Sequence, residues 1–282
     1  MALRFGVVFL GLLCTFSPNN LPGGSVPSTR LPRLRSAAAL VKDQHTGELL
    51  LTKRAETAMP IASITKLMTA MVVMDARLDM EQLVTIEESD KDTLRHSRSH
   101  LPLGTRLTRR EALQVALMAS ENRAAHALGR TYPGGIGAFV KAMNEKAQAL
   151  GLADTYFEEP TGLSEGNVSS ARDLGRLADI ACHYPQICAY STQAKMIIQN
   201  GRKKLKFVNT NALVRSSRWQ IGLSKTGYIQ DSGRCLVMQA QLAGRPILLV
   251  LLNSNGTGER LDDANSIRQW LEGPRSTRKK RR

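Results

Sequence analysis

A serine and a lysine lie one helical turn apart in an apolar stretch of the chain. This stretch, residues 60–78, reads PIASITKLMTAMVVMDARL and contains Ser63 and Lys66. A spacing of three residues puts both side chains on one face of a helix. A serine hydroxyl needs a base to act as a nucleophile, and a lysine can be that base when burial or a neighbouring cation lowers its pKa. The pair therefore indicates a nucleophile and its activator, although a lone S-x-x-K match is common by chance.

Two further motifs strengthen this interpretation. The segment SEN supplies Ser120 and Asn122 at the end of a helical run, and KTG at 225–227 lies within a strand pattern. Ser120 follows Ser63 by 57 residues, and Lys225 follows Ser120 by 105 residues. The order S-x-x-K, S-x-N, K-T-G occurs in penicillin-binding proteins and class A β-lactamases. Each motif also lies in the setting that it requires: S-x-x-K at a helix start, S-x-N in a loop between helices, and K-T-G in a strand. We therefore predict acyl transfer on Ser63.

The chain resembles the low-molecular-weight penicillin-binding proteins, which are serine D-alanyl-D-alanine peptidases. The similarity covers roughly residues 36–272 and rests on PIASITKLMTAMVVMDARL, LMASENRAA, YPGG, FVKAMNEKAQALG, EPTGLSEGNVSSARDL, SKTGY and CLVM. Within this family the chain is most similar to D-alanyl-D-alanine endopeptidases of the penicillin-binding protein 7 type. The resemblance implies peptidoglycan cross-links as substrate, β-lactams as covalent inhibitors and no cofactor.

The resemblance also implies catalytic roles. Ser63 would attack the carbonyl of a D-alanyl peptide bond and form an acyl-enzyme, while Lys66 takes its proton. Ser120 would relay a proton to the leaving amine.

Substrate-binding roles follow from the same resemblance. Asn122 would bind the substrate amide, and Lys225 with Thr226 the terminal carboxylate. Gly227 would let substrate approach the strand closely. The N–H groups of Tyr228 and the nucleophile would form an oxyanion hole.

Three alternatives stay open. A class A β-lactamase needs a glutamate that activates the deacylating water, and Glu158 and Glu159 precede Pro160, but the surrounding segment favours the peptidases and a structural role for both acids. A D-alanyl-D-alanine carboxypeptidase would use the same acyl-enzyme. A non-catalytic wall-binding protein would account for the basic charge but not for the three motifs.

His96 and His100 have no nearby cysteine or acidic partner, so no metal site is expected.

The chain is strongly basic, with a formal charge of +15 over 282 residues. Two clusters contribute: GRKKLKF at 201–207, and RSTRKKRR at 275–282, which holds six basic side chains. The simplest interpretation is a solvated turn and a solvated tail. The functional alternative is attraction to an anionic wall or membrane surface. No zinc-finger or RNA-binding signature is present, so nucleic acid is not an expected partner.

The N-terminus is typical of an exported protein. Arg4 precedes the apolar run FGVVFLGLLCTF at 5–16, whose twelve residues are too few to cross a bilayer, since a spanning helix takes about 20. Such a run fits a signal-peptide core. We therefore expect a signal segment at 1–17, a linker at 18–35, the peptidase domain at 36–273 and a basic tail at 274–282. The expected location is the periplasm, with the protein peripheral to membrane or wall.

The coarse pattern predicts an α+β fold, and the family resemblance implies that it is of the β-lactamase/transpeptidase type. Strand patterns at 36–42 and 48–53 flank a polar turn, and others occur in WQIGLSKTGYI, RCLVMQAQL and PILLVLL. Helical patterns fill the middle, with capping boxes at 108–111 and 170–173 and a stop at Gly151. A last helix contains DANSIRQWLEG. This order suggests one antiparallel sheet built from both chain ends, covered by helices, with a helical subdomain in the middle.

The cysteines do not define a disulfide framework. Cys182 and Cys188 flank HYPQI, and Cys235 lies in an apolar strand pattern. Because an exported protein meets oxidants, we predict a local disulfide between the first two and a reduced, buried Cys235.

Overall fold

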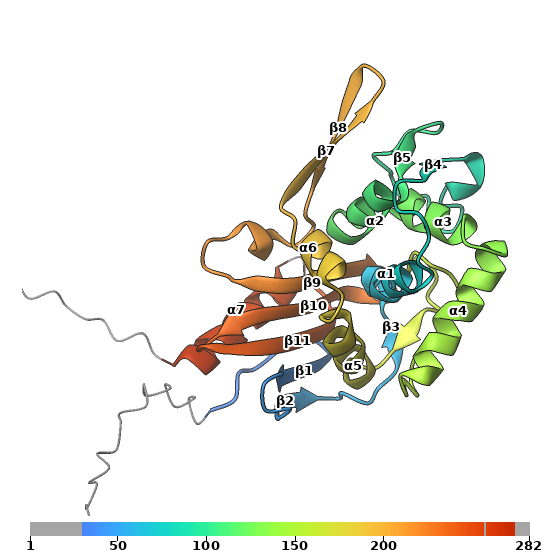
Figure 1. The fold of residues 1–282 in the computed structure, drawn as a ribbon. Coiled ribbons are helices and arrows are strands. Elements are labelled where there is room, and N and C mark those ends of the chain that lie inside the picture. Colours follow the sequence, from blue (N-terminus) through green and yellow to red (C-terminus); the bar gives the residue numbers. More distant parts are fainter. Residues whose placement is uncertain (1–29, 257, 274–282) are drawn as a thin grey trace, which may run out of the picture.

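The computed structural model describes residues 30–256 and 258–273, which form a sheet and a group of helices packed against it (Figure 1). The expected signal segment at 1–17 and basic tail at 274–282 lie outside these described residues. None of the helices in the described ranges is both long and apolar enough to span a bilayer.

The main sheet has five antiparallel strands in the order β2-β1-β11-β10-β9. Its strands are β1 (Ala38–Asp43), β2 (Leu49–Lys53), β9 (Ile221–Ile229), β10 (Gly233–Leu242) and β11 (Arg245–Ser254). The central pairing joins the two ends of the domain, since Ala38 of β1 lies opposite Leu252 of β11. The predicted sheet, built from both ends of the chain, is confirmed.

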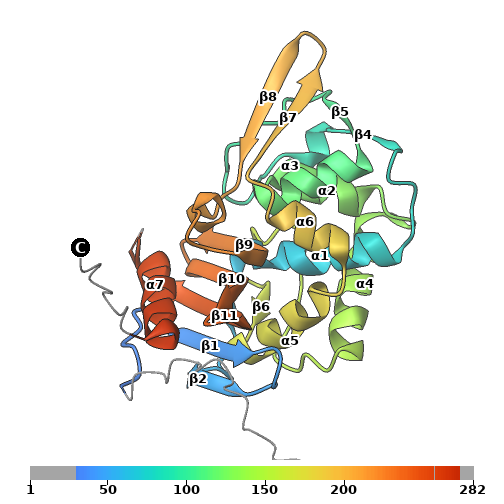
Figure 2. The same cartoon turned by 60° about the vertical axis from the view of Figure 1, so that its left-hand side comes forward.

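Both faces of this sheet are covered, as Figure 2 shows. Leu248 and Val250 of β11 belong to the core under the helices, whereas Ile247 and Leu249 belong to a second core under α7 (Glu259–Glu272). Side chains alternate between the faces of a strand, so a strand buried on both sides reads as the continuous apolar run seen in the sequence.

The helical part follows the first hairpin and carries most of the larger core. Its elements are α1 (Lys66–Asp75), α2 (Arg109–Met118), α3 (Asn122–Arg130), α4 (Gly135–Ala149), α5 (Ala171–Ala181) and α6 (Pro185–Ser191). Short 3-10 turns are η1 (Ala62–Thr65), η2 (Glu88–Asp90) and η3 (Ala212–Arg215). Two small ladders join β3 (Met59–Pro60) to β6 (Val168–Ser169) and β4 (Leu83–Thr85) to β5 (Arg106–Thr108).

The predicted helix boundaries are confirmed at three points. Thr108 and Glu111 form a reciprocal capping box at the start of α2. Ser170 accepts the N–H of Asp173 at the start of α5. After α4 the chain passes through Gly151 at a φ of 66°, a left-handed conformation that glycine adopts without strain.

A long hairpin was not predicted. Strands β7 (Lys195–Asn200) and β8 (Lys203–Val208) pair with each other and project from the body (Figures 1 and 2). The basic cluster at 201–207, interpreted above as a turn, forms the tip and one strand of this hairpin.

The predicted disulfide between Cys182 and Cys188 is wrong in this structure, since both are free thiols. The connection between α5 and α6 brings them together, but Cys188 Sγ lies 3.5 Å from the Cys182 carbonyl oxygen, as a thiol donating to the backbone. A hydrogen bond from the Cys182 thiol lowers the pKa of Cys188 to about 7. Cys235 is a buried free thiol, as predicted.

Candidate active site

The nucleophile pair is formed where a 3-10 turn becomes a helix. Ser63 lies in η1, and Lys66 is the first residue of α1. Lys66 Nζ lies 2.9 Å from Ser63 Oγ, 2.8 Å from Asn122 Oδ1 and 2.6 Å from the Thr161 carbonyl oxygen. As an ammonium it donates to all three oxygens. Once neutral, its lone pair can accept the Ser63 hydroxyl proton, which is the requirement for a general base.

Burial prepares Lys66 for this role. Its side chain is only 1% exposed, and burial lowers the pKa of Lys66 to about 8, while the carboxylates of Glu159, Glu121 and Asp92 act in the opposite direction. With that pKa, about a tenth of the lysine is neutral at pH 7. The sequence explains the burial, because apolar residues surround Lys66 throughout α1.

The second motif occupies the turn between α2 and α3. Ser120 has a φ of 60° there, a conformation uncommon for residues other than glycine. Its Oγ accepts a hydrogen bond of 2.9 Å from Lys225 Nζ, which also donates to the Thr226 carbonyl oxygen. Burial, then the charges of Lys66 and Arg260, hold the pKa of Lys225 well below its usual value. A carboxylate arriving nearby would favour the charged form of Lys225.

Two glycines let the backbone around Ser63 pack closely. A Cβ at Gly227 would lie 2.8 Å from the Ile61 carbonyl oxygen, and one at Gly162 would lie 2.0 Å from that of Ala62. The sequence analysis assigned the space at Gly227 to substrate. In the structure the protein's own η1 turn fills part of that space, so this glycine is needed for η1 to pack on β9.

A cavity of about 250 Å³ opens above these groups. It is lined by Ser63, Ser120, Asn122, Thr210, Thr226, Gly227, Tyr228 and Arg260. Six of the eight lining residues were predicted as site residues, and the other two predicted residues, Lys66 and Lys225, are buried beside it. The structure therefore brings all the predicted site residues together.

Sequence reasoning missed Thr210 and Arg260. Thr210 follows β8, and its Oγ1 lies 2.6 Å from Thr226 Oγ1. Arg260 lies in α7 and donates to the carbonyl oxygens of Gly227 (3.2 Å) and Cys235 (3.4 Å). Its Nε is buried and has no hydrogen-bond partner among the described residues. No sequence motif identifies either residue. Thr210 reaches the site because the chain after β8 packs against β9, and Arg260 reaches it because its side chain extends from α7 to the backbone of β9 and β10.

A loop at 158–167 holds the Thr161 carbonyl against Lys66. The Glu159 carboxylate accepts the backbone N–H groups of Thr161 (2.6 Å), Gly162 (2.5 Å) and Leu163 (2.8 Å). Glu158 is exposed and accepts from Ser164 Oγ. The structural interpretation of both acids is confirmed. With the Ser164 N–H and the Asn167 amide also donating to it, this carboxylate is poorly suited to activate the water that a class A β-lactamase requires.

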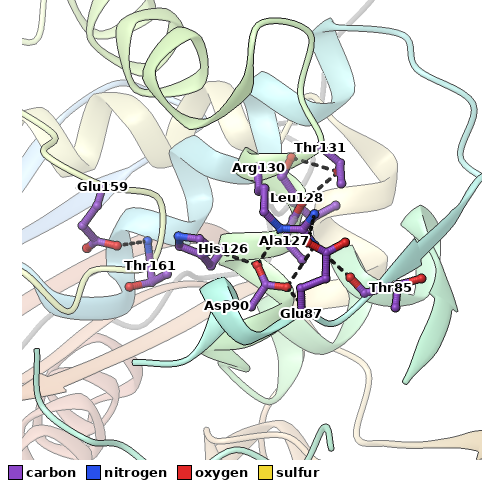
Figure 3. A network of polar contacts seen from close by, with 10 residues as sticks. All are labelled: Thr85, Glu87, Asp90, His126, Ala127, Leu128, Arg130, Thr131, Glu159 and Thr161. Carbon is purple, nitrogen blue, oxygen red and sulfur yellow. Dashed lines mark hydrogen bonds and ion pairs between the residues drawn. The ribbon is translucent and has the colours of Figure 1, made fainter. Parts of the chain in front are cut away.

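Behind Asn122, a polar network attaches η2 to α3, as Figure 3 shows. The buried Asp90 carboxylate lies 2.8 Å from His126 Nδ1 and accepts Arg130 Nε and Nη2 at 3.0 Å each. Burial raises the pKa of Asp90, but the hydrogen bonds from His126 and Arg130 outweigh it and keep the pKa below its usual value. The network fixes α3, whose first residue is Asn122.

Ser63 with the buried Lys66, next to a second Ser–Lys contact and between an antiparallel sheet and a helical part, is the arrangement of a serine acyl-transfer enzyme. The chain matches the D-alanyl-D-alanine carboxypeptidase family of peptidases over residues 25–256 and belongs to that family.

Relatives with known names support this assignment. The chain is 44% identical over 251 residues to a D-alanyl-D-alanine endopeptidase of Pseudomonas aeruginosa, covering 87% of this chain and 81% of that protein. It is 40% identical over 266 residues to one of Escherichia coli, covering 93% and 86%. Among solved structures, the Streptomyces K15 DD-transpeptidase superposes with a TM-score of 0.80 at 26% identity, covering 86% of this chain and 99% of that one. The predicted family and fold are confirmed.

Proposed function

We propose that this protein is a serine D,D-peptidase of peptidoglycan that cleaves D-alanyl–diaminopimelate cross-links through an acyl-enzyme on Ser63. The observation that carries the proposal is the 2.9 Å contact between Ser63 Oγ and Lys66 Nζ at the edge of the cavity, with Lys66 buried and its pKa lowered to about 8. A hydroxyl with a partly neutral amine in contact is an activated nucleophile.

Acylation begins when neutral Lys66 accepts the Ser63 proton and Oγ attacks the D-alanyl carbonyl carbon. The negative charge that develops on the carbonyl oxygen is stabilised by the N–H groups of Ser63 and Tyr228, each donor being worth about 3 kcal/mol in other acyl-transfer enzymes. The C–N bond then breaks, and Ser120 passes a proton to the departing amine. Water later attacks the ester, and Lys66 serves again as base.

Substrate recognition uses side chains from the start of α3 and from β9. The Asn122 side chain is fixed by Lys66 on its oxygen and by Ser97 Oγ, 2.9 Å from its nitrogen. It binds the amide of the acyl-donor peptide. The carboxylate on the leaving side binds Thr226 and Lys225, and Arg260 adds positive potential.

The endopeptidase assignment is supported by the two relatives named D-alanyl-D-alanine endopeptidase at 44% and 40% identity. The carboxypeptidase alternative has support of its own, because the matched family carries that description and a Bacillus subtilis D-alanyl-D-alanine carboxypeptidase is 32% identical over 258 residues. Both reactions use the same acyl-enzyme.

The decisive experiment is mass analysis of purified cross-linked and uncross-linked muropeptides after incubation with the protein. We expect cross-linked dimers to become monomers, and we expect Ser63→Ala protein to leave them intact. Loss of terminal D-alanine from monomers while dimers persist would establish the carboxypeptidase instead. A protein that changes neither substrate would contradict both.

The location belongs to this proposal as well. The signal-like run at 5–16 and a peptidoglycan substrate together favour an exported, periplasmic protein. The six basic residues at 275–282 would hold it loosely at anionic wall or membrane. β-Lactams would acylate Ser63 as substrate analogues.

A further inference from the structure

The β7–β8 hairpin is held in a fixed orientation by its inner face. Ile198 and Phe207 are buried in the larger core, and the Phe207 ring meets His100 edge-on at 6.2 Å between centroids. Near the tip, Asn200 Nδ2 donates to Thr105 Oγ1 at 3.2 Å. One face of the hairpin is thereby attached to the body, and the other faces solvent.

The outer face, hereafter the basic face, consists of Lys195, Ile197, Lys204, Lys206 and Val208, which alternate in register with the buried residues. Arg202 extends it at the tip, whereas Lys203 pairs with Asn200 and lies in register with the inner face. Residues 195–208 include no acidic side chain. No ion pair found among the described residues involves any of these five cations. Ile197 is 58% exposed and Val208 47% exposed.

A solvated edge is the simpler interpretation of such lysines, because edge-strand lysines also prevent sheets from pairing with one another. That role does not explain why two large aliphatic side chains lie exposed between the cations. A face that alternates cations with aliphatic groups instead fits an extended anionic polymer with apolar side chains, such as a peptide rich in alanine and carboxylates.

The basic face begins beside the active site. Two residues after β8 comes Thr210, which lines the cavity and contacts Thr226. The base of the hairpin is fixed by Asn209 Nδ2, which donates to the carbonyl oxygens of Ser191 and Gln193 at 2.9 Å each. A cavity of about 250 Å³ holds only the scissile portion of a cross-linked polymer, so neighbouring parts of that polymer have to lie on the surrounding surface.

We infer that the basic face binds the carboxylates of stem peptides next to the cross-link that occupies the Ser63 cavity. This inference rests on the proposed function, and it makes the hairpin a second binding site for the same polymer. Position favours the wall over a lipid surface, because β8 leads within two residues to Thr210, which lines the cavity that takes the cross-link. The hairpin thus selects polymeric over small substrates.

The test compares Lys204→Gln/Lys206→Gln protein with a control of equal charge change, Arg77→Asn/Lys141→Gln, whose sites are exposed and on other elements. Both are made in the full chain. Co-sedimentation with isolated sacculi, and separately with vesicles of phosphatidylglycerol and phosphatidylcholine, is measured at low and high salt. Hydrolysis of intact sacculi, hydrolysis of a soluble cross-linked dimer, and penicillin acylation are measured as well.

We expect the hairpin variant to bind sacculi roughly tenfold more weakly than the control at low salt, with the difference lost at high salt. Hydrolysis of sacculi should slow by a similar factor, while dimer hydrolysis and acylation match the control. Equal binding and hydrolysis of sacculi by the two variants would overturn the inference. So would a loss confined to vesicles of phosphatidylglycerol and phosphatidylcholine, which would indicate a membrane-binding surface. If the wild-type protein bound sacculi through Lys204 and Lys206 but left the dimer intact, the docking surface would stand and the proposed function would be wrong.

Discussion

Lys66 is the residue in which stability and chemistry oppose each other. Burial lowers its pKa to about 8 from an ordinary 10.5, so the folded protein binds fewer protons than the unfolded chain between these values. For this residue, stability therefore rises as the pH increases from about 8 towards 10.5 and is lowest below 8. The same shift supplies the neutral amine that Ser63 needs.

Removing either member of the pair tests the chemistry directly. Ser63→Ala should form no penicilloyl adduct, because no hydroxyl remains to be acylated. Lys66→Ala should acylate at least a hundredfold more slowly, since general-base catalysis contributes on the order of 10²–10⁴. Mass spectrometry of the intact protein after incubation with penicillin measures both. An adduct on the Ser63→Ala protein would show that the nucleophile is misassigned.

The carboxylate of Glu159 opposes the effect of burial on the pKa of Lys66. It raises the pKa of Lys66 more than any other charge does, so Glu159→Gln should lower that pKa further and move the rise of acylation rate with pH to lower pH. Glu158→Gln is the control, since the exposed Glu158 is not among the groups that shift Lys66. An unchanged or higher midpoint in the rate–pH profile of Glu159→Gln would contradict this explanation.

At the scale of elements, the 158–167 loop positions the nucleophile turn by direct contact. A methyl group at Gly162, where φ is 81°, would overlap the Ala62 carbonyl. Gly162→Ala should therefore lower the free energy of unfolding by roughly 3 kcal/mol and slow acylation, because η1 has to move.

Gly104 provides the matched control, because its φ is 76° but a methyl group there would touch nothing within 4 Å. Gly104→Ala should cost only about 1–2 kcal/mol of backbone strain and leave acylation unchanged. Equal effects of the two substitutions in denaturant unfolding and penicillin acylation would show that strain, not contact, explains the loss at Gly162.

Elements with local signals could be predicted from the sequence, and those that depend on packing could not. The Thr108 side chain caps a helix start, and Gly151 adopts the left-handed conformation at a helix end. Ser63 and Lys66 were recognised because they lie three residues apart, within one helical turn. The β7–β8 hairpin was missed because its basic cluster was interpreted as a solvated turn, although Leu205 and Phe207 alternate with the lysines of β8. Arg260 was missed because its place at the cavity depends on how α7 lies across the sheet.

At the scale of the whole domain, one buried carboxylate joins the segment before β1 to the last helix, α7. Asp263 of α7 is 2% exposed, and it accepts the N–H groups of Arg35 (2.9 Å) and Ser36 (2.8 Å) and the Ser36 hydroxyl (2.6 Å). Asp263→Ala removes all three hydrogen bonds and leaves the Ser36 hydroxyl with only Ser254 Oγ, at 2.9 Å. It should lower the free energy of unfolding by roughly 3 kcal/mol.

The neighbouring exposed acid gives the comparison. Asp262→Ala should change the free energy of unfolding by less than about 0.5 kcal/mol, as surface substitutions usually do. Denaturant titration measures both, and acylation by penicillin at 25 °C should be unchanged in both because neither residue touches the cavity. A loss at Asp263 no larger than at Asp262 would contradict the structural role of this carboxylate.

The pairing of β1 with β11 also sets the order of events during synthesis. Ala38 emerges from the ribosome early, and Leu252, which lies opposite it, emerges near the end. Until then β1 has only its hairpin partner β2, and a two-stranded hairpin alone is marginally stable in water. Contacts between such distant segments also form slowly. The five-stranded sheet therefore cannot close until β9, β10 and β11 have been made, so its completion is a late, post-translational step for this chain.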